Sequence, residues 1–273
     1  MVTASLVLFN TKESDLHKVL ECAHLSEISR IFVLDNSPTD RLKVITEGLS
    51  DKVEYVFGHG NIGYGCAHNI GLQKAKDYNS TYHIVLNPDI YFDPSAVSSI
   101  KSFMDEHNDV GLVLPKVIYP NGDLQYLCKL LPTPLDIFGR RLLPERMIKH
   151  WNDRFEMRQM GYDKVWNCPI LSGCFMFLRL SDIEKTGGFD ERFFMYFEDF
   201  DLMRRLHKVC KTVYYPRVMI THNHAAEHHT NKALLKASIR STIMYFDKWG
   251  WLFDKERRII NKHAFDEEHH VID

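Results

Sequence analysis

The first 114 residues alternate short apolar runs with helical patterns, and this alternation constrains the fold more than any other feature of the chain. The apolar runs, which predict strands, span residues 5–9, 31–34, 53–57, 83–86 and 110–114. Helices are predicted at residues 16–25, at residues 67–75, and after Asp93-Pro94, with Asp93 as N-cap and Pro94 as first helical residue. This order is typical of an α/β protein with a mostly parallel central sheet and helices on both faces.

Polar residues follow three of these predicted strands. Asp35 follows the second strand, a glycine turn follows the third, and Asn87-Pro88-Asp89 follows the fourth. Ligands of parallel sheets bind beyond the carboxyl ends of the strands, so we expect these residues to share a cleft.

The glycine turn, Gly58-His59-Gly60-Asn61-Ile62-Gly63, matches the GxGxxG pattern of dinucleotide-binding proteins. That fingerprint normally follows the first strand of its unit, whereas this turn follows the third. We therefore predict a turn that lets the backbone approach a nucleotide, with amide contacts from Asn61 and Asn69. A turn with a purely structural role, or an NAD(P)-dependent oxidoreductase, remains an alternative.

Three carboxylates, Glu198, Asp199 and Asp201, fall within four residues, directly before an apolar helical pattern formed by Leu202, Met203, Leu206 and Val209. The acids are thus predicted at a helix N-terminus, where the helix dipole favours negative charge. A structural role for acids at such a position is common. Together with Asp89 and His222, however, they suggest a divalent metal and a separate general base.

Asp89 and His222 are the predicted metal ligands, because each closes a strand-like run. One carboxylate suffices when the ligand is a metal diphosphate, since phosphate oxygens and waters complete the coordination shell. Oxygen ligands suit Mg²⁺ or Mn²⁺, and the histidine favours Mn²⁺. A zinc site is disfavoured because no cysteine pair accompanies the histidine cluster at His222, His224, His228 and His229.

Composition narrows the class of protein further. A net charge of −2 over 273 residues gives no reason to expect nucleic acid as a partner. No apolar run is long enough to span a membrane, and the N-terminus predicts a strand rather than a signal peptide. We therefore expect a cytoplasmic protein whose six cysteines stay reduced.

The second half of the chain is less regular. Residues 131–166 lack a clear period and are predicted to be a long insertion or lid. Strand character returns at 171–178, and the tail after residue 232 is helical. The basic segment 131–164, with Arg140 and Arg141, and the C-terminal Trp/Lys/Arg segment around Trp249 and Trp251 offer peripheral contact with an anionic membrane. Simple packing of both regions is the alternative.

In chain order, these motifs resemble glycosyltransferase family 2, in particular its bacterial rhamnosyltransferase branch of O-antigen and surface polysaccharide synthesis. The resemblance covers residues 4 to 250 and rests on Asp35, Asn61-Ile62-Gly63-Tyr64-Gly65, Asn69-Ile70-Gly71, Leu86-Asn87-Pro88-Asp89, Ser172-Gly173-Cys174-Phe175-Met176, Gly188-Phe189-Asp190-Glu191, Phe194 to Asp201, and His222. It implies a GT-A fold over residues 1–232, with 131–166 as a variable acceptor region or lid, and a helical extension at 233–273 packed on that domain.

The resemblance also implies an inverting transfer from a nucleoside-diphosphate sugar, most simply dTDP-L-rhamnose, to a lipid-linked saccharide. It assigns the general base to Asp199, with Glu198 or Asp201 orienting the base or the acceptor. The donor would contact Asp35, Asn61, Gly63, Asn69, Asn87 and Gly173, and a Mn²⁺ or Mg²⁺ ion would bind Asp89 and His222. Another donor such as UDP-galactose, or a nucleotide-sugar-binding protein without catalysis, remains open.

Overall fold

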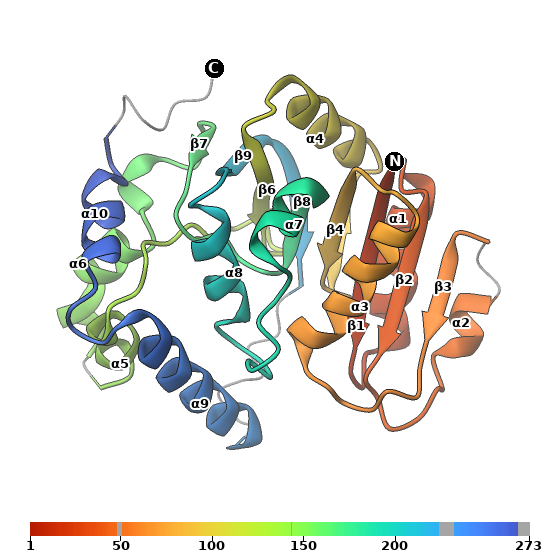
Figure 1. Cartoon of the computed structure of the whole chain (residues 1–273), viewed down its shortest axis with the longest axis horizontal. Coiled ribbons are helices and arrows are strands. Elements are labelled where there is room, and N and C mark those ends of the chain that lie inside the picture. Colours follow the sequence, from red (N-terminus) through yellow and green to blue (C-terminus); the bar gives the residue numbers. More distant parts are fainter. Residues whose placement is uncertain (48–50, 143, 224–231, 267–273) are drawn as a thin grey trace.

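The computed structural model describes residues 1–47, 51–142, 144–223 and 232–266, and these form one nine-stranded sheet with helices around it (Figure 1). The sheet has the order β3-β2-β1-β4-β8-β6-β9-β5, with β7 paired to β9. The strands are β1 (Val2–Leu8), β2 (Arg30–Asp35), β3 (Val53–Val56), β4 (Tyr82–Leu86), β5 (Ile90–Phe92), β6 (Val110–Ile118), β7 (Trp166–Asn167), β8 (Phe175–Arg179) and β9 (Lys211–His222).

The sheet is mostly parallel, as predicted. Strands β3, β2, β1 and β4 pair in parallel, and β6 pairs in parallel with β9. Strand β8 lies between β4 and β6 and is antiparallel to both. The six strands β3, β2, β1, β4, β6 and β9 therefore all run in one direction. Strands β5, β7 and β8 run the other way. The predicted strand at 171–178 begins only at Phe175, because residues 171–174 form the connection that reaches the site described below.

The helices are α1 (Glu13–Leu25), α2 (Lys43–Glu47), α3 (Tyr64–Asp77), α4 (Ser95–Glu106), α5 (Pro134–Leu142), α6 (Glu145–Phe155), α7 (Leu180–Thr186), α8 (Glu198–Leu206), α9 (Lys232–Trp249) and α10 (Lys255–His263), with a short 3₁₀ turn, η1 (Arg158–Met160). The Asp93 carboxylate accepts a hydrogen bond from the Ser95 N–H, so Asp93 caps α4 as predicted. Residues 131–166 are not one irregular loop, since α5 and α6 lie within them. The tail is two helices because Gly250, with φ of +100°, ends α9.

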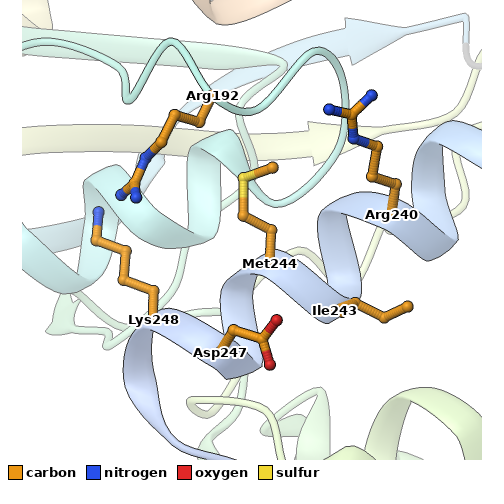
Figure 2. A pocket seen from close by; sticks show the side chains of 6 residues that line it. All are labelled: Arg192, Arg240, Ile243, Met244, Asp247 and Lys248. Atoms are coloured by element: carbon orange, nitrogen blue, oxygen red, sulfur yellow. The ribbon is translucent and has the colours of Figure 1, made fainter.

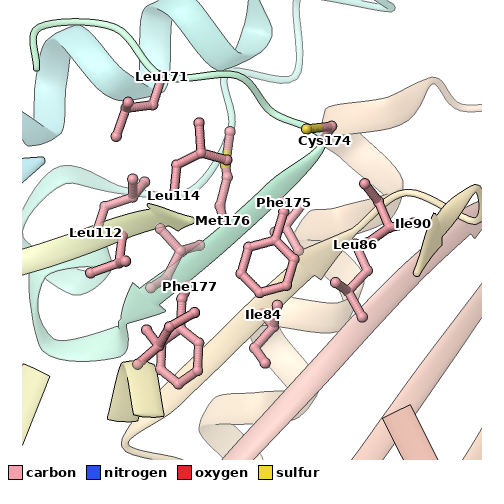
Figure 3. Close-up of a cluster of buried hydrophobic side chains, with 14 of the residues drawn as sticks. Ile84, Leu86, Ile90, Leu112, Leu114, Leu171, Cys174, Phe175, Met176 and Phe177 are labelled. Carbon is pink, nitrogen blue, oxygen red and sulfur yellow. The ribbon is translucent and has the colours of Figure 1, made fainter. Parts of the chain in front are cut away.

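The core explains why the strands are continuous apolar runs. Every residue of β1 and β4 is buried, because helices cover both faces of the central strands. Figure 3 shows buried side chains of neighbouring strands packed together between β4, β6 and β8. Residues Ile84, Leu86, Leu112, Leu114, Phe175 and Phe177 are among them.

A second, smaller apolar cluster attaches the C-terminal helices. It joins Phe193 and Phe197, which precede α8, to Tyr245 and Phe246 of α9. Leu202, Met203 and Leu206 of α8 are buried on the main core, as the sequence pattern predicted. Val209 is not part of that face, because α8 ends at Leu206 and the Val209 side chain is 45% exposed.

Candidate active site

The carboxyl ends of β1, β2, β4 and β9 lie at one edge of the sheet, and the order of connection reverses between β1 and β4. Such a switch point is where open α/β sheets bind their ligands. Because β8 is antiparallel, its beginning also lies at this edge, and the Asn87 N–H donates to the Cys174 carbonyl over 2.9 Å. Asp35, Asn87, Gly173 and His222 therefore all lie at this edge, as expected for Asp35, Asn87 and His222, which end or directly follow strands.

Asp35 ends β2 and is fully buried. One carboxylate oxygen accepts the Ser37 N–H over 2.8 Å, and the other accepts the Tyr55 hydroxyl over 2.5 Å. Burial raises the pKa of Tyr55, and the hydrogen bond to Asp35 raises it further. The hydrogen bonds thus fix the orientation of the Asp35 carboxylate at the end of its strand.

The glycine turn is held against the same strand end. The neighbouring Asn36 amide donates to the Gly63 carbonyl over 3.1 Å, and exposed Asn61 accepts the Gly63 N–H over 3.3 Å. Gly63 has φ of +90°, and a Cβ there would lie 2.2 Å from the Phe194 carbonyl oxygen. A side chain cannot fit, so glycine is required where this turn contacts the acidic loop.

Tyr64, which was not predicted as a site residue, links three parts of the site. Its hydroxyl lies 3.0 Å from Asn87 Oδ1 and 2.8 Å from the Gly173 carbonyl oxygen. Burial raises the pKa of Tyr64 well above its usual value, and the nearby Glu198 carboxylate adds to this effect. The phenol therefore stays neutral and keeps its proton for donation. Its position in the GYG sequence beside Asn61 was the only available signal.

The acidic cluster begins α8, as predicted, and its backbone is unusual. Tyr196 and Phe197 both have left-handed conformations, with φ of 67° and 65°. Consecutive left-handed residues other than glycine are uncommon and persist only where the surrounding packing holds them. This turn places the Asp199 carboxylate 3.1 Å from the Gly173 N–H, while its other oxygen accepts the Phe200 N–H over 2.9 Å.

The protein environment raises the pKa values of both Glu198 and Asp199. Burial raises the pKa of Asp199, whereas the charge of Lys129 and the Gly173 N–H oppose that rise. Burial also raises the pKa of Glu198 well above its usual value, and the adjacent Asp199 charge adds to this effect. Glu198 Oε2 is buried and has no hydrogen-bond partner among the described residues. Buried acids with raised pKa values cluster at catalytic sites, and only Asp199 of this pair has a cation and the Gly173 N–H beside it to favour its ionised form.

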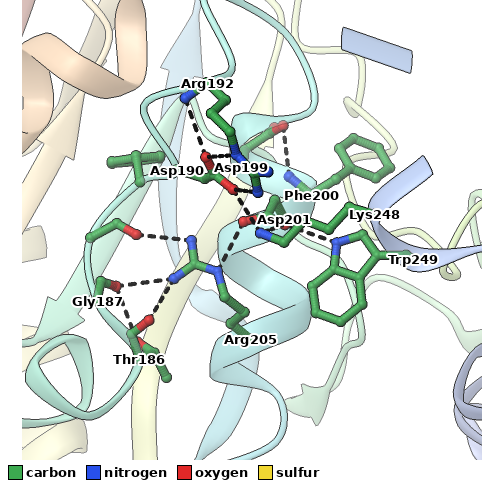
Figure 4. A network of polar contacts seen from close by, with 12 residues as sticks. Thr186, Gly187, Asp190, Arg192, Asp199, Phe200, Asp201, Arg205, Lys248 and Trp249 are labelled. Carbon is green, nitrogen blue, oxygen red and sulfur yellow. Dashed lines mark hydrogen bonds and ion pairs between the residues drawn. The ribbon is translucent and has the colours of Figure 1, made fainter. Parts of the chain in front are cut away.

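Asp201 faces away from this pair and is fully buried (Figure 4). It accepts the Arg205 guanidinium over 2.9 Å, the Trp249 indole N–H over 2.8 Å and Lys248 Nζ over 2.6 Å. Lys248 also pairs with Asp190 over 2.8 Å. The contacts with Trp249 and Lys248 tie α8 to α9, whereas the contact with Arg205 lies within α8.

Asp89 and His222 lie together at the edge of the sheet, with Asp89 Oδ1 3.4 Å from His222 Nε2. Gln125 Oε1 lies 3.0 Å from His222 Nδ1, which orients the ring so that Nε2 faces Asp89. Burial lowers the pKa of His222, but the Cys174 sulfur and the Asp89 carboxylate outweigh burial and raise it to about 10. One imidazole held by a second residue and one carboxylate form a donor set that suits Mn²⁺ once the imidazole has released its Nε2 proton in response to the charge of the arriving ion.

This pair alone does not complete a metal site. Among the described residues, no group of three or more His, Cys, Asp or Glu side chains is placed to hold a metal ion. A bound ion would therefore take its remaining ligands from substrate oxygens and water, as the sequence reading expected. The other residues of the predicted histidine cluster lie outside the described residues: His224, His228 and His229.

Asn69 is engaged within the protein. Its amide donates to the Phe189 carbonyl over 2.9 Å, and its oxygen accepts the Phe189 N–H over 2.8 Å. A Cβ on Gly188 would lie 2.3 Å from the Asn69 oxygen. Asn69 therefore holds the Gly188-Phe189 segment against α3, and its predicted contact with a donor stays a prediction.

Two pockets lie along α9 rather than at the strand ends. Figure 2 shows one of about 390 Å³, between α9 and the loop that carries Arg192.

Of the predicted membrane-facing residues, Lys248 and Trp249 are engaged by Asp201, and Arg257 is buried. The side chains of Arg140 and Arg141 lie outside the described part of the chain. None of the helices in the described residues combines the length and apolar character needed to cross a bilayer.

Known proteins resemble this chain in sequence and structure. The family model "Glycosyl transferase family 2" matches residues 6–187, well over half of the 273 residues, although it ends before the acidic cluster. An N-acetylglucosaminyl-diphospho-decaprenol L-rhamnosyltransferase of Mycobacterium tuberculosis is 24% identical over 77% of this chain and 75% of that protein. Rhamnosyltransferase WbbL of Escherichia coli is 23% identical over 96% of each chain.

Among solved structures, GalNAc-T7 with UDP, GalNAc and Mn²⁺ superposes with a TM-score of 0.64 at 13% identity. The superposition covers 94% of this chain but only 49% of GalNAc-T7, so this chain spans about half of that protein. At 13% identity, this structural similarity is evidence for a shared fold only.

Proposed function

The chain belongs to glycosyl transferase family 2 and has the GT-A fold, and on that premise we propose that it moves L-rhamnose from dTDP-L-rhamnose to a hydroxyl of a lipid-linked saccharide. Such a reaction serves bacterial O-antigen or surface polysaccharide synthesis. The observation that carries the proposal is the similarity to Rhamnosyltransferase WbbL along 96% of both chains. Family membership also decides against an oxidoreductase built on Gly58 to Gly63.

The proposed base is Asp199. In an inverting transfer, the acceptor oxygen bonds to the anomeric carbon, the bond from that carbon to the diphosphate breaks, and the hydroxyl proton passes to a base. The Gly173 N–H and Lys129 favour the ionised form of Asp199, which supports this role. Glu198, whose pKa is raised further by burial, would stay protonated beside it and orient the acceptor.

Asp35, Asn61 and Gly63 would contact the nucleoside. The glycine turn that contains Asn61 and Gly63 is held at the end of β2, next to Asp35, by the hydrogen bond from Asn36 to Gly63. Asn87 and Gly173, which both accept hydrogen bonds from the Tyr64 hydroxyl, would lie along the sugar diphosphate. A Mn²⁺ or Mg²⁺ ion bound at Asp89 and His222 would supply charge neutralisation for the departing diphosphate. The enzyme would act on the cytoplasmic side of the membrane that carries its acceptor.

A panel of nucleotide sugars tests the donor. We expect release of nucleoside diphosphate from dTDP-L-rhamnose in the presence of Mn²⁺ and an acceptor extract, and little from UDP-galactose or GDP-mannose. Calorimetry should show binding of dTDP and none of NAD. If UDP-galactose were the preferred substrate, the donor assignment would change but the enzyme class would not. Binding of NAD that dTDP does not compete with would contradict the proposal.

A further inference from the structure

Helix α9 carries apolar side chains on two faces. Its inner face, with Tyr245 and Phe246, is buried against the loop before α8. On its outer side, Leu235, Ile239 and Ile243 are 44%, 40% and 42% exposed. Residues four apart follow one line along a helix, so these three form a continuous aliphatic ridge on the surface.

This ridge borders a groove, here called the α9 groove, of about 460 Å³. Its lining consists of three aliphatic and three cationic side chains, with no acidic one: Lys232, Leu235, Lys236, Ile239, Arg240 and Ile243. The α9 groove adjoins the pocket in Figure 2, because Arg240 and Ile243 line both, and that pocket adds the cations Arg192 and Lys248 together with Met244 and one acid, Asp247. Within the α9 groove itself, cations thus accompany the ridge without an acidic side chain among its lining residues.

The cations of the α9 groove differ from those farther along the C-terminal segment. Lys248 is paired with Asp190 and Asp201, and Arg257 is buried. Lys232, Lys236 and Arg240, by contrast, make no ion pair with any described residue and are exposed. Their charges are therefore available to an external anion.

We propose that the α9 groove is the surface through which the protein rests on an anionic lipid bilayer. An exposed aliphatic ridge flanked by Lys and Arg has the chemistry of an interfacial helix, with apolar side chains at the acyl boundary and cations among lipid phosphates. A second copy of this chain is a poorer occupant. In a symmetric dimer through this face, the same three cations would oppose one another.

The location fits the proposed function, on which the biological meaning of this surface rests. The Ser241 hydroxyl on the inner side of α9 donates to the Met195 carbonyl over 2.8 Å, three residues before the acidic cluster. A bilayer at the outer side of α9 would thus lie one helix away from the loop that carries Glu198 and Asp199. A lipid-linked acceptor could then reach the site without leaving its membrane.

Vesicle co-sedimentation of the full chain tests the proposal. We expect wild type to bind vesicles of equimolar phosphatidylcholine and phosphatidylglycerol at low salt, to dissociate at high salt, and to ignore pure phosphatidylcholine. Each cation near an anionic surface contributes about fivefold to partitioning, so Lys236→Glu/Arg240→Glu should lower it by about 30-fold or more. Thermal unfolding should be unchanged, because both side chains are exposed.

Lys255→Glu/Arg258→Glu is the matched control, since it makes the same charge change on exposed positions of α10. It should retain most of the binding. Equal loss in both variants would overturn the α9 groove as the docking surface, as would wild type that stays in the supernatant at low salt. These outcomes are independent of donor turnover in solution, which tests the proposed function separately and should survive in Lys236→Glu/Arg240→Glu.

Discussion

The same substitution, Asp to Asn, should lower stability at Asp201 and turnover at Asp199, although the two residues are only two positions apart. Asp201→Asn keeps the shape of a fully buried side chain but removes the charge that Arg205, Lys248 and Trp249 share. Asp199→Asn removes a charge that sits beside Gly173 at the edge of the sheet. We expect the first to lower stability and the second to lower turnover.

The contacts set the size of the effect at Asp201. Hydrogen bonds to a charged group contribute about 1.5–3 kcal/mol each, and Asn can still accept one of them. Arg205 keeps the Thr186 carbonyl and Lys248 keeps Asp190, so neither cation is left alone. The loss should therefore be about 3 kcal/mol, at the low end of the cost of breaking a buried ion pair. For a chain of this size, that lowers the Tm by roughly 6–12 °C.

The effect at Asp199 is kinetic. Loss of a general base should lower kcat by about 10² to 10⁴, or roughly 3 to 5 kcal/mol, with donor binding nearly unchanged. Because burial raises the pKa of Asp199, its ionisation opposes folding as the pH rises through that pKa. Asp199→Asn should remove this contribution and leave the Tm equal or higher.

Calorimetry and initial rates at a temperature well below both transitions measure the two effects. A melting temperature of Asp201→Asn equal to that of wild type would refute the reasoning about its contacts. Near-normal turnover of Asp199→Asn would refute its assignment as base and move the role to Glu198. Loss of turnover in folded Asp201→Asn would mean that α9 positions the site more tightly than these distances imply.

Three further perturbations have defined outcomes. Lys129→Met should raise the pKa of Asp199 and move the acidic limb of the kcat/KM profile to higher pH; an unmoved limb would contradict the role of that charge. Gly63→Ala should destabilise by more than about 1 kcal/mol, because φ is positive and the new Cβ meets the Phe194 carbonyl; an unchanged denaturation midpoint would show that the turn can shift. EDTA should abolish transfer and Mn²⁺ should restore it, whereas full activity of Asp89→Ala in chelator would rule out the proposed metal ligand.

The parallel half of the fold could be predicted because the apolar runs of β1, β2 and β4 are buried on both faces and each connection is local. The antiparallel insertion of β8 between β4 and β6 could not, since strand direction depends on pairing between residues as distant as Leu86 and Phe175. The helices within 131–166 were missed although both are amphipathic, because each is short and Pro132, Pro134 and Pro144 interrupt the segment.

The candidate site was only partly accessible from the sequence. Residues at strand ends could be placed, since parallel strands end at one edge. The different positions of Asp199 and Asp201 follow from helix geometry, because two residues turn the chain by about 200°. Which of the two contacts Gly173 at the sheet edge depends on how α9 packs on α8, and no local pattern encodes that packing. Tyr64 was missed because its partners, Asn87 and Gly173, are far away in sequence.

The attachment of Phe197 to Tyr245 and Phe246 has a consequence for engineering. Every proposed catalytic, donor-binding and metal-binding residue precedes residue 223, which invites a minimal enzyme truncated after β9 or a chimera that exchanges the tail. Such a cut would remove the apolar support beneath the left-handed turn at Tyr196 and Phe197, and with it the placement of Asp199. A transplant that keeps the acidic loop and α9 from one parent should preserve activity, because those two segments form a single exchangeable unit.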